Sequence, residues 1–68
     1  MKDVPNVFYL KKSVGKKYKC HVIARTQDSD EVIITYKYYG RHKQYWHYEV
    51  EPEELLLFNI NLTNGLRK

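Results

Sequence analysis

The sequence has little of what secreted, membrane-spanning or catalytic proteins usually need. Cys20 is the single cysteine, so no internal disulfide is possible, and we expect a reducing, cytoplasmic environment. The longest apolar run, Leu55 to Phe58, is far shorter than the roughly 20 residues of a membrane-spanning helix. The N-terminus also lacks the continuous apolar segment of a signal peptide. We therefore expect neither secretion nor a membrane partner.

Motifs for catalysis and for metal binding are also missing. Gly15 is followed by two lysines, but not by the second glycine or the Ser/Thr of a phosphate-binding loop. Cys20 and His21 are adjacent on an expected strand and point to opposite faces, so at most one of them could join His42 and His47 in a zinc site. Three ligands on one side are therefore hard to assemble. We expect no enzymatic activity, no metal and no cofactor.

What the sequence does contain is typical of one small globular domain spanning residues 1–68. Hydrophobic residues make up 43% of the chain and aromatics 15%, with seven tyrosines, which is too apolar for a disordered tail. A chain of 68 residues builds one thin core and leaves little material for a deep catalytic cleft. The formal net charge of +4 is compatible with nucleic acid or with an acidic protein as partner.

Four stretches show the alternation of β-branched and aromatic residues that is typical of strands. They cover residues 7–10, 18–26, 31–39 and 44–50, and polar or glycine-containing segments separate them. The alternation places Arg25 in an outward set, and it predicts that Trp46 points inward while Tyr45 and His47 point outward. We expect a core that includes Val22, Ala24, Ile34, Tyr36, Trp46 and Leu56.

The segment after Pro52 has two possible structures. Proline followed by Glu53 and Glu54 favours one short helical turn, after which residues 56–62 would form a last strand, since 59–62 alternate with period two. The alternative is a helix that runs from Pro52 to about Asn61. We favour the strand because it would close the exposed edge of the sheet.

The order of strand, long loop, three-stranded meander, helical turn and last strand resembles that of the SH3-like small barrels, which include the Tudor and KOW-type modules. The fold class we predict is therefore mainly β, a five-stranded SH3-like barrel with one short helical turn before the last strand. In such barrels the last strand lies beside the first.

The segment from Gly15 to Leu56 also resembles a family of short bacterial proteins of unknown function. The matching elements are Tyr18, Ile23-Ala24-Arg25, Glu31, Ile33-Ile34, Tyr36-Lys37, Tyr39-Gly40, Trp46 and Pro52-Glu53-Glu54. The turn at 26–29 departs from the family pattern, as do the distances around Gly40 and Pro52. The resemblance implies a shared fold, and it supplies no activity.

The clearest functional signal is the separation of charges along the chain. Basic residues from 11 to 25 and from 37 to 43 are not interrupted by acids, and all acids except Asp3 lie at 28–31 and 49–54. We predict a basic and aromatic outer face of the meander that comprises Arg25, Lys37, Tyr39, Arg41, Lys43, Tyr45 and His47. Cations interleaved with exposed aromatics suit a nucleic-acid backbone with stacked bases. The first alternative is a protein-interaction or regulatory module of phage or accessory type that adds a strand or docks a peptide at its edge. The second is a purely structural subunit that associates with itself.

Overall fold

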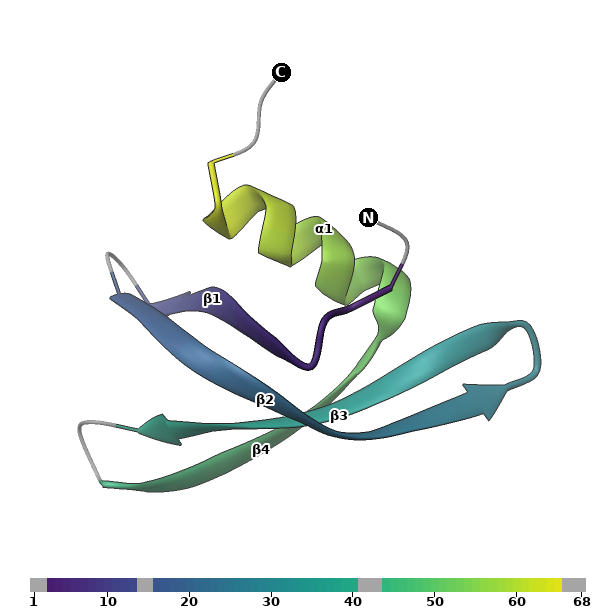
Figure 1. Ribbon diagram of the computed structural model, residues 1–68, viewed down its shortest axis with the longest axis horizontal. Coiled ribbons are helices and arrows are strands. Elements are labelled where there is room, and N and C mark those ends of the chain that lie inside the picture. Colours follow the sequence, from purple (N-terminus) through teal and green to yellow (C-terminus); the bar gives the residue numbers. More distant parts are fainter. Residues whose placement is uncertain (1–2, 14–15, 41–43, 66–68) are drawn as a thin grey trace.

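The chain forms a four-stranded antiparallel sheet with one helix on a single face (Figure 1). The computed structural model describes residues 3–13, 16–40 and 44–65. The elements are β1 (Val7–Ser13), β2 (Lys16–Asp28), β3 (Glu31–Gly40), β4 (Tyr45–Pro52) and α1 (Glu53–Thr63). Each strand pairs antiparallel with the next one in the sequence. The mainly β prediction is confirmed.

The prediction of a closed, five-stranded barrel is wrong. β1 and β4 lie at opposite edges of an open sheet, and no fifth strand occurs in residues 3–13, 16–40 or 44–65. The segment expected to close the barrel is α1, which is the alternative structure considered for it. A helix covers one face of the sheet instead of pairing with an edge, so the edges remain apart.

α1 forms because its apolar residues meet the core at helical spacing. Leu56, Ile60 and Thr63 are buried, and the positions 56, 60 and 63 lie on one side of a helix. Glu53 and Glu54 occupy the first turn, where negative charge is favourable. Gly65, with φ of 73°, takes the left-handed conformation that commonly ends a helix. No helix in the described part of the chain is long and apolar enough to span a membrane.

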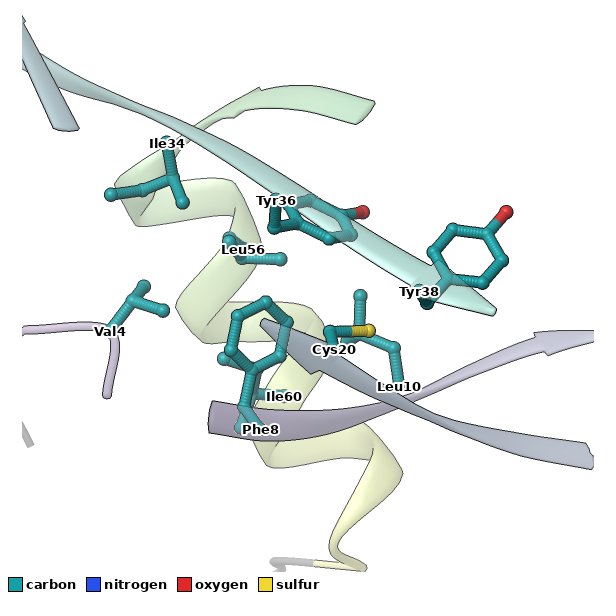
Figure 2. Close-up of a cluster of buried hydrophobic side chains, with 9 residues drawn as sticks. All are labelled: Val4, Phe8, Leu10, Cys20, Ile34, Tyr36, Tyr38, Leu56 and Ile60. Atoms are coloured by element: carbon teal, nitrogen blue, oxygen red, sulfur yellow. The ribbon is translucent and has the colours of Figure 1, made fainter. Parts of the chain in front are cut away.

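The core lies between α1 and the face of the sheet that α1 covers (Figure 2). Its members are Val4, Phe8, Leu10, Cys20, Ile34, Tyr36, Tyr38, Leu56 and Ile60. Three residues of the predicted core are confirmed: Ile34, Tyr36 and Leu56. Val22 is only partly buried, and Ala24 is exposed.

The predicted orientation of β4 is wrong. Tyr45 is paired with Gly40, and His47 with Tyr38, so Tyr45 and His47 lie on the helix side of the sheet. Trp46 is paired with Tyr39 on the other face and is 40% exposed. Because Gly40 pairs with Tyr45, each even-numbered residue of β3 lies opposite an odd-numbered residue of β4. The even-numbered residues of β3 face the helix, so the odd-numbered residues of β4 do as well. The alternation within β4 does not decide this, because both of its faces carry aromatic side chains.

A bulge in β2 overturns the predicted orientation of Arg25. The register with β3 shifts between Val22 and Ala24, so Ile23 is an extra residue in the strand. Such a bulge re-aims the side chains that follow it. Arg25 therefore lies on the helix side, where its guanidinium donates to the Val4 carbonyl at 2.6 Å and lies 3.6 Å from the Glu53 carboxylate.

Candidate nucleic-acid interface

The face of the sheet that α1 leaves uncovered, here called the open face, collects aromatic and basic side chains from all four strands. Residues paired across an antiparallel ladder point to the same face, so the registers identify its members. They include Val7, Tyr9, Lys11, Lys17, Lys19, His21, Thr35, Lys37, Tyr39, Trp46, Tyr48 and Val50, and Ala24, Thr26, Asp28, Glu31, Ile33 and Pro52 towards the β2–β3 end. Several of them are apolar or aromatic and exposed: Val7, Tyr9, Tyr39, Trp46, Tyr48 and Val50.

Two cross-strand rows organise the open face. The first row consists of Tyr9, Lys19, Tyr39 and Trp46. Tyr9 pairs with Lys19, and Tyr39 pairs with Trp46. Lys19 and Tyr39 are neighbours because the adjacent residues, Cys20 and Tyr38, are paired. The second row consists of Val7, His21, Lys37 and Tyr48. Neighbouring strands lie about 4.8 Å apart, so four positions span about 14 Å. Each row therefore brings basic and aromatic groups together over a distance comparable with a few nucleotides.

Trp46 is held in place by contacts with three open-face neighbours. The Tyr39 and His21 rings approach its indole edge-on, with centroids 5.5 and 6.0 Å away. The Lys37 ammonium lies 4.4 Å from the indole centroid, in cation–π geometry. Two aromatic rings and a cation therefore lie beside the indole in the absence of a ligand.

The acidic residues lie away from the two rows. Glu51 and Glu53 are on the helix side. The Tyr36 hydroxyl donates a hydrogen bond to the Glu51 carboxylate at 2.6 Å, and the Val4 backbone amide donates one to the Glu53 carboxylate at 3.0 Å. A hollow of about 640 Å³ between the β2–β3 turn and the start of α1 is lined by five acids, Asp28, Asp30, Glu31, Glu53 and Glu54. Negative charge therefore gathers on the helix side and at the β2–β3 end of the sheet. The two rows carry lysines instead.

The predicted binding residues are divided by the structure. Lys37 and Tyr39 lie on the open face, as expected, while Arg25, Tyr45 and His47 lie on the helix side. Arg41 and Lys43 lie outside the described residues.

On the helix side, these groups serve packing. His47 stacks on Tyr38 with centroids 5.1 Å apart, and a Cβ on Gly40 would collide with the His47 ring at 2.2 Å. Tyr45 lies 4.5 Å from the same imidazole.

The sequence interpretation missed Tyr9, Lys19, Trp46 and Tyr48 as members of this surface. Tyr9 and Lys19 occupy outward positions of their strands, and the alternation alone could have identified them. Placing Trp46 and Tyr48 on the open face required knowledge of the length of the β3–β4 connection. That length decides whether the even-numbered or the odd-numbered residues of β4 face away from the helix.

Cys20 and the possible metal ligands are the other groups that the sequence suggests for chemistry. Cys20 is fully buried, and this burial raises the pKa of its thiol to about 11, which makes it a poor nucleophile. No three His, Cys, Asp or Glu side chains among the described residues lie together in a way that could hold a metal ion.

Comparisons with known proteins add no relative. No family model, no curated protein and no solved structure matches this chain.

Proposed function

We propose that this protein is a non-catalytic module that binds single-stranded nucleic acid on the open face of its sheet. The observation that carries the proposal is the row Tyr9, Lys19, Tyr39 and Trp46, with Lys37 beside the indole. The acids of this face, Asp28 and Glu31, lie at its β2–β3 end, away from the row. A four-stranded sheet that stacks bases on exposed aromatic side chains is a recurrent solution for single-stranded RNA.

Stacking and charge would contribute in different ways. Each base stacked on an aromatic side chain contributes about 1–3 kcal/mol to binding, and every type of base can stack in this way. Lys19 and Lys37 would neutralise phosphates and release counterions, which makes the affinity fall with salt. The bases of a duplex are stacked on one another, so the aromatic row favours a single strand.

The contact between Lys37 and Trp46 fits this binding mode. An exposed cation–π contact contributes only about 0.5–1 kcal/mol, which is less than a stacked base. Lys37 can therefore leave the indole for a phosphate while a base takes its place. Trp46 is the single tryptophan of the chain, so its fluorescence reports this exchange directly.

The first test is a titration of the protein with labelled mixed-sequence single-stranded RNA and DNA, and with a duplex, at low salt. We expect saturable binding of the single strands with a Kd below about 100 μM, because nonspecific binders commonly reach that range. The duplex should bind more weakly, and Trp46 fluorescence should change in step with the anisotropy. The proposal is wrong if no oligonucleotide binds below about 100 μM.

A matched set of tyrosine variants locates the site. Tyr9, Tyr39 and Tyr45 have similar exposure, at 47%, 46% and 49%, but Tyr45 lies on the helix side. Tyr9→Ala and Tyr39→Ala should each weaken binding about 5- to 100-fold with an unchanged salt slope, while Tyr45→Ala should have little effect. An equal loss for Tyr45→Ala would exclude the open face.

Lysine variants test the charge contribution separately. The double substitution Lys19→Ala, Lys37→Ala should flatten the dependence of log affinity on log salt by about 1.4 units, because a single strand contributes about 0.7 per phosphate contact. An unchanged slope would show that these lysines do not contact phosphates.

A further inference from the structure

β4 presents a free edge that is rich in exposed aromatic residues. Within the described residues its only strand partner is β3, and Figure 1 shows β4 at the border of the sheet. Its outer side chains are the most exposed of the large hydrophobic residues on the open face, with Tyr48 at 62% and Val50 at 64%. Unpaired backbone groups on such an edge are a template for another strand.

The two edges of the sheet differ in how they discourage pairing. β1 carries Lys11 and Lys12, and its register is interrupted between Lys11 and Ser13, which are features that natural proteins use to protect an edge. The stretch from Tyr45 to Glu51 contains neither lysine nor arginine, and it pairs with β3 without interruption. β4 carries Glu49 and Glu51 and ends at Pro52, but only β1 has both lysines and a break in its register.

We propose that the partner of this edge is β4 of a second copy of the chain, paired antiparallel about a two-fold axis normal to the sheet. Centred on Tyr48, this pairing sets Tyr48 opposite its own copy, Trp46 opposite Val50, His47 opposite Glu49, and Tyr45 opposite Glu51. Aromatic and β-branched residues are favourable cross-strand partners, and the Glu49 carboxylate can accept a hydrogen bond from the His47 imidazole.

Other registers are less complementary. A shift by one residue would place open-face side chains opposite helix-side ones. Centring the pair on Glu49 would set two carboxylates directly opposite, which is destabilising. Centring it on His47 would set two imidazoles opposite, and Glu51 would lose its partner within the strand. Only the register centred on Tyr48 matches every residue from 45 to 51.

The dimer would join two open faces into one eight-stranded surface, because the axis is normal to the sheet. Pairing one edge buries less than the roughly 800 Å² per partner of a standard interface, so association should be weak and dependent on concentration. The dimer does not depend on nucleic-acid binding, and each can fail without the other.

The experiment is sedimentation equilibrium of the ligand-free protein up to about 1 mM, a range that detects weak complexes. We expect the mass to rise with concentration from the 8.3 kDa of one chain towards twice that value. Tyr48→Asp and Tyr48→Lys should each weaken the dimer at least about tenfold, because like charges meet at the two-fold axis. An equimolar mixture of the two variants should regain the dimer mass, since a carboxylate then faces an ammonium group.

The matched control is Tyr9→Lys, which places a lysine on an exposed tyrosine at the opposite edge and should leave the dimer intact. Thermal melts monitored by circular dichroism check that every variant is folded. A wild-type chain that stays monomeric to about 1 mM overturns the proposal. So does a mixture of the two Tyr48 variants that associates no better than either one alone, and so does loss of the dimer in Tyr9→Lys.

Discussion

Tyr36 is a buried core residue that makes both apolar and polar contacts. Its ring packs edge-on against Phe8 at 5.3 Å, while its hydroxyl donates to Glu51 at 2.6 Å and accepts from the Lys12 ammonium at 3.2 Å. Burial and the neighbouring Glu51 carboxylate raise the pKa of Tyr36 well above its ordinary value of 10.0. This arrangement allows an acid to point to the helix side of β4.

Cys20 gives a prediction for alkaline pH. Burial raises the pKa of its thiol from an ordinary 9.0 to about 11, so the folded state disfavours the thiolate that the unfolded chain forms freely. The stability from the neutral thiol is complete below about pH 9 and is lost as pH rises towards 11. We expect urea unfolding to show a loss of up to about 1.4 kcal/mol per pH unit from this group, which Cys20→Ala removes. Equal slopes for the two proteins would contradict the assignment.

At the scale of elements, a few specific contacts connect α1 and the N-terminal segment to the sheet. Arg25 bridges the Val4 carbonyl and Glu53 at the start of the helix, because the bulge in β2 turns it to that side. At the other end, the Lys11 amide donates to the Thr63 hydroxyl at 3.0 Å. Both ends of α1 are therefore tied to segments far away in sequence.

Adjacent leucines in α1 provide a matched test of this packing. Leu56 is fully buried against the sheet, whereas Leu55 is half exposed. Leu56→Ala should lower the free energy of unfolding by about 2–5 kcal/mol, because it removes core contacts and leaves a cavity. Leu55→Ala should change it by less than about 1 kcal/mol. Similar losses in denaturant titrations of the two variants would show that the helix faces the sheet differently.

The whole molecule is a two-layer structure in which one layer is too short to cover the other. Its shortest dimension is 15 Å and its longest is 36 Å. An 11-residue helix is only about 16 Å long, so part of the helix-side face and all of the open face lack a helical cover. The uncovered aromatic residues of the sheet follow from this mismatch.

Because α1 is the helix that covers the core, we predict that the sheet does not fold without α1. A chain ending at Pro52 would expose the buried sides of Val4, Phe8, Ile34 and Tyr36. Because burial of each large apolar side chain contributes about 1.5–3 kcal/mol, exposing them together costs an amount comparable with the whole stability of so small a domain. Circular dichroism should show no cooperative thermal transition for this fragment, whereas the full chain should give one. A native-like transition in the fragment would mean that the sheet is stable alone.

Several features of this fold could be predicted from local sequence. The strand regions around 18–26, 31–39 and 44–50 follow from β-branched and aromatic alternation, which acts on adjacent residues and needs no tertiary information. The two faces of β3 followed in the same way, with Ile34 and Tyr36 inward and Lys37 and Tyr39 outward. The choice between strand and helix after Pro52 was not local, because it depended on whether Leu56 and Ile60 had a sheet face to cover.

By itself, the sequence determined the mainly β composition, the separation of acids from lysines and the outward position of Lys37 and Tyr39. The tertiary structure alone decided which side of β4 faces the helix, because the pairing of Gly40 with Tyr45 inverts the parity of a strand that is aromatic on both sides. It also decided that Arg25 turns inward, because a bulge is stabilised by contacts with Val4 and Glu53 that lie far away in the chain. Alternation specifies that a strand has two faces, but only the register of its neighbours specifies which of them meets the core.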